Sequence, residues 1–250
     1  MKKIINNSFR SIIAITTMIF LISSSCEKDK PDLPENPLNG RTTAVFNPDK
    51  KYGTVADVDG NIYKTIKIGN QIWMAENLRT THYRDGEAIP LVSDSADWAA
   101  QLSGAYCNYN DTENLDTIAT YGRLYNWYSL ANNESIAPEG WRVPNAGDWN
   151  ILIEYLGGDS IAGRKLKEAG NLHWVDPVDS DNSSGFTALP GGWRQIPFNY
   201  NKMGYYCDYW TSSYNGEISA AFLYLFSWNP LAYKGYNFKT KGYSVRCIKG

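Results

Sequence analysis

One stretch constrains the fold of this chain more than any other, because residues 137–158 combine a turn, a short strand and a capped helix. The sequence there is A-P-E-G-W-R-V-P-N-A-G-D-W-N-I-L-I-E-Y-L-G-G. Pro144 ends the short strand 141–143, since proline lacks the N–H that a paired strand needs. Asn145 can then cap a helix, and Asp148 places a carboxylate at the positive end of the helix dipole.

The helix that follows Asn145 has one apolar face. Its apolar residues recur at the i, i+3, i+4 and i+7 spacing that places side chains on one side of a helix. They are Trp149, Leu152, Ile153 and Leu156. Two glycines at 157–158 then stop the helix. We expect this face to pack against a sheet, with Trp149 directed into the core.

The same stretch resembles the G-W-x-[VL]-P-[ST]-x-x-E-W-x-x-L signature of the Fibrobacter succinogenes major paralogous domain. Four further sequence words of that family occur in order along the chain. They are Y-G-R-L-Y-N-W at 121–127, S-G-F-T-A-L-P-G-G at 184–192, Y-W-T-S-S at 209–213 and Y-S-V-R-C at 243–247. The resemblance covers residues 55–250 and implies a variant of the C-type-lectin-like fold, distantly similar to formylglycine-generating enzymes.

The expected fold class is therefore α+β: one C-type-lectin-like domain at 51–250, with a twisted antiparallel sheet, two main helices and long loops. The domain is expected to begin with a β-meander, because the Asp59-Gly60 turn separates the strand patterns at 54–58 and 62–68. Helical spacing predicts the first main helix at 121–131, and the helix after Asn145 is the second. The other expected elements are a strand at 71–74, short helices at 95–102 and 161–169, a strand at 104–109 and closing strands at 236–248.

The N-terminus has the pattern of a bacterial export signal. Three basic side chains precede a short apolar run at 11–22, which is too short to span a membrane comfortably. The sequence S-S-S-C at 23–26 resembles a lipobox, with Ser23 where leucine is usual, so we expect Cys26 to carry the lipid. The alternative is an ordinary signal peptide cleaved nearby, with Cys26 uninvolved.

Three segments follow from this pattern: a signal peptide at 1–25, a flexible Pro-rich tether at 26–50 and the domain at 51–250. The tether carries four prolines and interspersed charges without apolar periodicity, which favours an extended chain. Its start, C-E-K-D-K, resembles the charged tract of surface-exported lipoproteins of Bacteroidetes. We expect an outer-membrane lipoprotein of the cell envelope, held at the membrane by its lipid anchor and displayed at the surface.

Net charge argues against a nucleic-acid partner. The whole chain carries a formal charge of −2, and loss of residues 1–25 would remove three positive charges and no negative ones. The mature protein would then be more acidic and would have no basic run.

The cysteines give little support to metal or redox chemistry. Beyond Cys26 the chain has Cys107, Cys207 and Cys247, and no C-x-x-C pair. The oxidising envelope permits one disulfide. Cys107 and Cys247 fall on cysteine positions of the family, so the resemblance favours a Cys107–Cys247 bond. Three buried thiols are the alternative.

An enzymatic function has few sequence signals. The two histidines, His82 and His173, lie near no nucleophile motif, and we expect both in loops or at the rim. Formylglycine-generating enzymes use cysteine chemistry near the chain end, where this sequence has Cys247 and no second cysteine closely upstream. We expect no catalysis and no cofactor.

An acidic cluster is the one candidate for a metal ion. Asp176, Asp179 and Asp181 offer the hard oxygen ligands that calcium prefers. They lack an EF-hand frame, and the calcium motifs of sugar-binding C-type lectins do not occur. We therefore favour a solvated turn and expect no metal, with calcium as the open alternative.

Aromatic residues of the final third are the best candidates for a binding face. Tyr214, Trp228 and Tyr233 lie in stretches rich in Gly, Asn and Pro, whereas Trp193 and Trp210 lie in family words and are expected in the core. Exposed loop aromatics are suited to stacking on sugar rings or to anchoring a protein partner. We expect a non-catalytic recognition module for a glycan or a protein. The alternatives are a formylglycine-generating-like enzyme and a structural subunit of a surface assembly.

Overall fold

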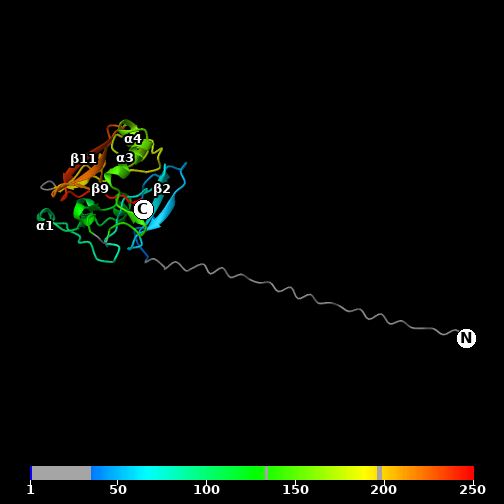
Figure 1. The fold of residues 1–250 in the computed structure, drawn as a ribbon, viewed down its shortest axis with the longest axis horizontal. Coiled ribbons are helices and arrows are strands. Elements are labelled where there is room, and N and C mark those ends of the chain that lie inside the picture. The colour runs from blue at the N-terminus through cyan, green and yellow to red at the C-terminus, as the bar shows by residue number, and fades with distance from the viewer. Residues whose placement is uncertain (2–34, 133–134, 196–198) are drawn as a thin grey trace. The chain divides into compact units, whose positions relative to one another are not determined.

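The computed structural model describes Met1 and residues 35–132, 135–195 and 199–250, apart from the side chain of Asn199. Residues 35–250 form a mixed α/β domain (Figure 1), which confirms the α+β class. The remainder of the predicted signal peptide, Cys26 and residues 27–34 lie outside the described part. No helix within the described ranges has the length and apolar character needed to cross a membrane.

Two antiparallel sheets contain most of the strands. The first has the order β1-β2-β3-β12-β6. Its strands are β1 (Gly53–Ala56), β2 (Ile62–Ile68), β3 (Gln71–Met74), β12 (Ile248–Lys249) and β6 (Trp141–Arg142). The second has the order β11-β10-β9. Its strands are β11 (Ala232–Phe238), β10 (Ser219–Phe226) and β9 (Tyr206–Asn215). The predicted opening meander is confirmed as β1, β2 and β3.

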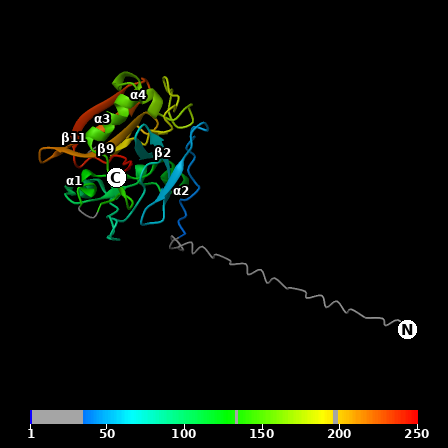
Figure 2. The ribbon, with the colours of Figure 1, turned by 45° about the vertical axis from the view of Figure 1, so that its right-hand side comes forward.

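Short elements connect these sheets. Two further strand pairs join β4 (Tyr106–Cys107) to β5 (Leu124–Tyr125) and β7 (Trp193–Gln195) to β8 (Asn199–Asn201). The helices are α1 (Ser95–Ala100), α2 (Leu115–Tyr121), α3 (Ala146–Tyr155) and α4 (Asp159–Leu166). Figure 2 shows α3 and α4 lying over β9 and β11, so the helices cover one face of the three-stranded sheet.

Helix α3 forms as its sequence predicts. The Asn145 side chain accepts a hydrogen bond of 3.0 Å from the Asp148 N–H, and the Asp148 carboxylate accepts one of 2.7 Å from the Asn145 N–H. This reciprocal capping box satisfies two amide groups that the first turn leaves free. The Arg142 guanidinium donates a hydrogen bond of 2.6 Å to the same carboxylate. Burial alone would raise the pKa of Asp148, but this contact and the Asn145 N–H hold that pKa below its usual range.

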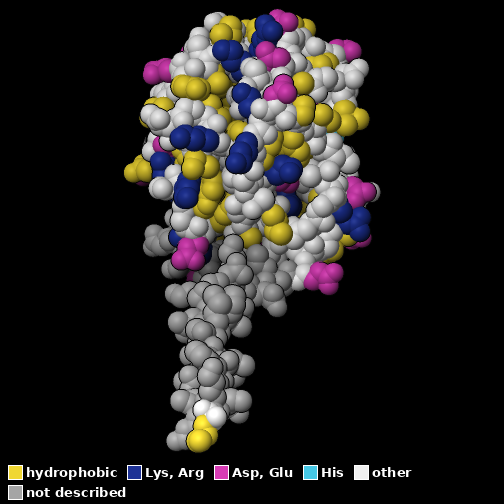
Figure 3. Space-filling view, turned by 90° about the vertical axis from the view of Figure 1, so that its right-hand side faces the viewer, with side chains coloured by type: hydrophobic (Ala, Val, Ile, Leu, Met, Phe, Trp, Pro, Cys, Tyr) yellow, Lys and Arg dark blue, Asp and Glu magenta, His cyan; other side chains and the backbone are white. Residues whose placement is uncertain are grey.

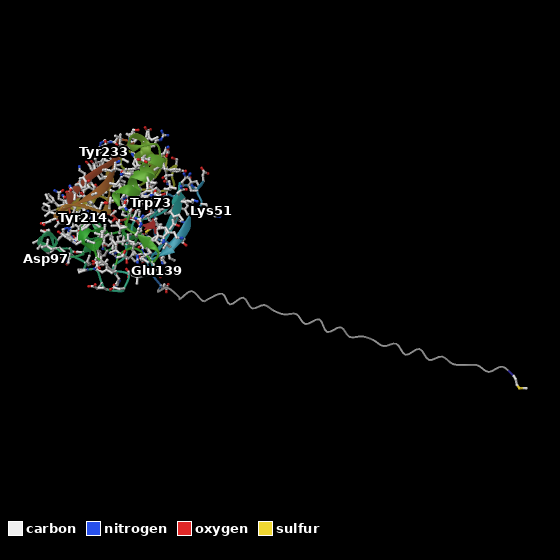
Figure 4. The ribbon with its side chains drawn as sticks, in the orientation of Figure 1. Lys51, Trp73, Asp97, Glu139, Tyr214 and Tyr233 are labelled. Atoms are coloured by element: carbon white, nitrogen blue, oxygen red, sulfur yellow. The ribbon has the colours of Figure 1, made fainter. Side chains whose placement is uncertain are left out.

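The core lies between α3 and the two sheets. The Trp149 ring packs 4.6 Å from Trp73, which is labelled in Figure 4, and stacks 5.5 Å from Tyr209. Leu152 and Ile153 complete the buried face of the helix. The apolar stripe predicted from the sequence is therefore the stripe that the structure buries.

The helix predicted at 121–131 is wrong. Helix α2 ends at Tyr121, and the φ of 74° at the C-cap residue Gly122 lies in the left-handed region that favours glycine. Leu124 and Tyr125 then pair with β4, and the Tyr125 N–H also bonds to the carbonyl of Tyr243. Only a 3-10 turn follows, at Trp127–Ser129. Pairing with distant strands therefore overrides the helical spacing of the apolar residues.

The predicted Cys107–Cys247 disulfide is also wrong, because both cysteines are free and buried, as is Cys207. Cys107 belongs to β4 and packs beside Trp98, whereas Cys247 precedes β12 and packs in a different cluster. Burial raises the pKa of the Cys107 thiol to about 11 and that of Cys207 to about 12. These thiols act as small apolar core groups.

Residues 35–50 do not form the expected mobile tether but pack on the domain, which therefore begins before residue 51. Leu38 is buried beside α2. The Thr43 hydroxyl lies 2.9 Å from Nε2 of His173, whose Nδ1 lies 2.7 Å from the Glu168 carboxylate. The Val45 N–H donates to the same carboxylate at 2.6 Å. Such hydrogen bonds give a polar segment fixed partners. His173 lies in a loop, as predicted, and its side chain is largely covered.

Candidate functional site

The three-stranded sheet has one face turned away from the helices. Side chains alternate along a strand, so neighbours in β10 point to opposite faces. Leu223 and Leu225 join the core under α3. Phe222, Tyr224 and Phe226 consequently lie on the other face, where the adjoining strands add rings of their own.

A continuous layer of aromatic rings covers this face. Tyr224 stacks between two neighbours, with ring centroids 4.9 Å from Phe222 and 5.1 Å from Tyr233. Phe226 stacks 4.6 Å from Trp228. Gly235 lies opposite Phe222 in the register, and a Cβ atom there would approach that ring to 3.0 Å. Glycine thus leaves room for the ring to lie over β11.

A cleft of about 180 Å³ opens in this aromatic layer. Its lining residues are Trp193, Gln195, Tyr206, Asp208, Phe222, Tyr224, Phe226, Asn237 and Tyr243. Trp193 meets Tyr206 edge to face at 4.7 Å, so β7 closes one side. The volume is below the range of about 300–1,000 Å³ for pockets that enclose drug-sized ligands. The cleft therefore accommodates one small ring or head group.

Asp208 is the acidic group of the cleft. Its side chain is only 4% exposed, and Oδ2 has no hydrogen-bond partner among the described residues. Burial raises the pKa of Asp208 well above its usual range, and the nearby Lys241 ammonium opposes that shift. None of the ion pairs found within the described ranges includes Asp208. A buried carboxyl oxygen without a partner is uncommon, and a ligand donor would satisfy it.

The structure brings together two of the three aromatic residues predicted to bind ligand. Trp228 is 47% exposed, and Tyr233 is half-buried; each packs against a ring that lines the cleft. Tyr214 is 68% exposed but contacts Trp127 at 6.0 Å. It lies at the opposite end of β9, roughly 26 Å along the strand from Tyr206, and Figure 4 shows it apart from Tyr233. The predicted three-residue face is therefore corrected to a site that excludes Tyr214.

Sequence reasoning missed Asp208. The signal is present in the strand pattern, because an acidic residue stands between aromatic residues in Y-C-D-Y-W at 206–210. In a strand, Tyr206, Asp208 and Trp210 share one face. An acidic side chain among aromatic ones in a strand is either exposed to solvent or part of a functional site. Only the packing of β7 and β10 around Asp208 shows that it is buried.

The acidic cluster proposed as an alternative calcium site lies in a turn region. Asp181 pairs with Arg164 at 2.8 Å and accepts the Ser183 N–H at 2.8 Å. Asp176 and Asp179 are exposed. Across the described part of the chain, no group of three or more Cys, His, Asp or Glu side chains is arranged to hold a metal ion.

A polar pocket elsewhere is a weaker candidate. Figure 3 views the side that carries β2, and Lys and Arg side chains gather there among apolar ones. A pocket of about 270 Å³ is lined by Lys50, Lys67 and Lys165 together with serine hydroxyls. The Lys165 ammonium already donates to the Leu156 carbonyl at 2.7 Å. The aromatic cleft has a buried group without a partner, and we therefore favour it.

Fold and cleft together define a class: a single α+β domain that offers an aromatic cleft on the open face of an antiparallel sheet. The model of the Fibrobacter succinogenes major domain matches residues 66–249, and the chain belongs to this family. Neither a curated protein nor a solved structure matches the chain. The likeness to C-type lectins and to formylglycine-generating enzymes stays a prediction.

Proposed function

We propose that this protein is a surface lipoprotein whose domain is a non-catalytic recognition module for a glycan, with a terminal sugar residue held in the aromatic cleft. The observation that carries the proposal is the set of six aromatic side chains around one buried carboxyl oxygen that has no partner among the described residues. Ring faces pack on the C–H surfaces of a sugar, and a carboxyl oxygen accepts from one of its polar groups.

The lining of the cleft supports binding rather than glycoside hydrolysis. Glycosidases generally use two carboxyl groups, one as the acid and the other as the base or nucleophile. Asp208 is the sole carboxyl group among the described residues that line the cleft. That lining also contains no Ser, Thr, Cys or His to act as a nucleophile or base.

Replacing Tyr224 by Ala is expected to weaken glycan binding by about 1–3 kcal/mol, because Tyr224 stacks between two rings and lines the cleft. The measurement is a glycan array with the full-length protein, followed by calorimetric titration of each hit. Tyr214→Ala is the matched control, since it removes an exposed tyrosine of the same sheet outside the cleft. Equal affinity of Tyr224→Ala and the unaltered protein for every hit would reject the site.

Replacing Cys26 by Ser is expected to move the protein from the membrane fraction to the soluble fraction, or to block its maturation. The lipid would supply buried acyl chains, each CH₂ contributing about 0.8 kcal/mol to membrane binding. Fractionation and mass spectrometry of the N-terminal peptide test this directly. An unchanged membrane fraction together with an unlipidated N-terminal peptide would exclude the anchor.

A further inference from the structure

We propose that the cleft recognises the ammonium group of an amino sugar at the end of the glycan, rather than a neutral sugar or its N-acetylated form. The inference rests on the proposed function and specifies its ligand. It depends on three features of the cleft: its few free hydrogen-bonding groups, its ring faces and the environment of Asp208.

The cleft has few polar groups with which to hold a neutral sugar. Three of its lining residues are polar and non-aromatic: Gln195, Asp208 and Asn237. Asn237 is already engaged, because its amide donates to the Tyr243 hydroxyl at 2.8 Å and its oxygen accepts the Phe238 N–H at 2.9 Å. Apart from phenolic hydroxyls, this leaves one carboxyl and one amide. A neutral ring that buried several hydroxyls here would leave some of them unsatisfied, which is costly.

An ammonium group suits the same surroundings. Cations are attracted to the electron-rich faces of aromatic rings, and this attraction needs no hydrogen bond. A single carboxylate then completes the site by accepting one N–H. The sugar ring itself would lie toward the exposed edge near Trp228, with its hydroxyls in water. A small cleft is enough for this arrangement.

Among the described titratable groups that face Asp208, one is a cation that would compete with a ligand ammonium. The titratable groups that face it are Lys241 and the hydroxyls of Tyr206, Tyr224 and Tyr243. The tyrosines add no positive charge, and Lys241 makes no ion pair with Asp208 within 4.0 Å in the described structure. Burial raises the pKa of Asp208 despite that lysine. A ligand ammonium next to Oδ2 of Asp208 would favour the ionised form of that carboxyl group.

An acetyl group on the nitrogen would remove both advantages. It converts the cation into a neutral amide, so the attraction to the ring faces and to the carboxylate is lost. It also adds bulk to a cleft of only about 180 Å³. The structure therefore predicts discrimination at one substituent of the terminal sugar.

The test compares three β-1,4-linked disaccharides that differ mainly at that substituent: the glucosamine disaccharide, its N-acetylated form and cellobiose. With the full-length protein at neutral pH, we expect calorimetry to give roughly tenfold tighter binding of the glucosamine disaccharide, within the range of cation–aromatic attraction. The affinity should fall as the pH is lowered, because the ammonium binds the ionised Asp208 and acid protonates that group. Cellobiose should show no such pH dependence.

Two variants isolate the charge. Asp208→Asn keeps the shape of the side chain and removes the carboxylate, so it should reduce the preference for the amine and abolish its pH dependence. Lys241→Gln removes the cation that favours the ionised form of Asp208, so the loss of the preference on acidification should begin at a higher pH. This test does not depend on the Asp208 variant folding. Thermal melts check that each variant is folded.

The outcomes separate the inference from the proposed function. Equal binding of the three disaccharides, or tighter binding of the N-acetylated form or of cellobiose, would overturn the amine inference and leave a glycan site in place. Failure of all three to bind, alongside array hits that depend on Tyr224, would also overturn the inference alone. Absence of any hit that depends on the cleft would overturn both.

Discussion

Replacing Trp149 by Ala is expected to lower the free energy of unfolding by about 3–5 kcal/mol, the range for truncation of a buried large aromatic side chain. Trp149 is fully buried and contacts Trp73, Phe186 and Tyr209. Its removal would leave a cavity where α3 meets both sheets. A domain of this size should then melt about 6–20 °C lower, which differential scanning calorimetry measures.

Two variants of the same helix serve as controls. Ile151 is 56% exposed on α3, so Ile151→Ala should change stability by no more than about 0.5 kcal/mol. Asn145→Ala should cost about 1 kcal/mol, because it removes a cap and no core volume. A Trp149→Ala protein that melted like Ile151→Ala would contradict the placement of α3.

Replacing Arg246 by Ala should also destabilise the domain by about 3–5 kcal/mol, through lost volume and unsatisfied buried acceptors. The Arg246 guanidinium is fully buried. It donates to the carbonyls of Phe186 and Thr187, and to the Asn77 side chain at 2.8 Å. It also lies over the Phe186 ring at 4.3 Å. Urea titration measures the loss.

Lysine and an exposed arginine provide the comparison for Arg246. Arg246→Lys keeps the charge, but a single ammonium cannot reproduce the several hydrogen bonds of a planar guanidinium. This variant should therefore recover only part of the lost stability. Arg41 forms an exposed pair with Asp116 at 3.0 Å, and Arg41→Ala should cost about 0–1 kcal/mol. Equal losses for Arg41→Ala and Arg246→Ala would show that the buried hydrogen bonds do not support the loop at 186–187.

Local patterns predicted the opening meander and α3. The Asp59-Gly60 turn and the alternation of β2 agree with each other, and the cap, stripe and stop around α3 also agree. Where neighbouring residues all favour one conformation and tertiary contacts reinforce it, the sequence is enough. The family words gave the class of the domain for the same reason.

Local patterns failed where distant partners decided the structure. The apolar spacing from Leu124 onward resembles a helix, yet strand pairing with β4 and with Tyr243 extends the chain at 124–125. Residues 35–50 look like a tether, yet Glu168, His173 and other distant groups supply the hydrogen bonds that hold them. Long-range pairing of this kind leaves no periodic signal in the sequence.

The sequence by itself determined the family, the α+β class and the helix that organises the core, because turns, caps and apolar stripes are set by residues close together along the chain. Only the tertiary structure decided the candidate site. Asp208 is one acidic residue in an aromatic strand until β7, β10 and the segment carrying Tyr243 close around it. Its burial and its unpartnered oxygen depend on residues far apart in the sequence, and a local sequence pattern cannot reveal which of these residues come together.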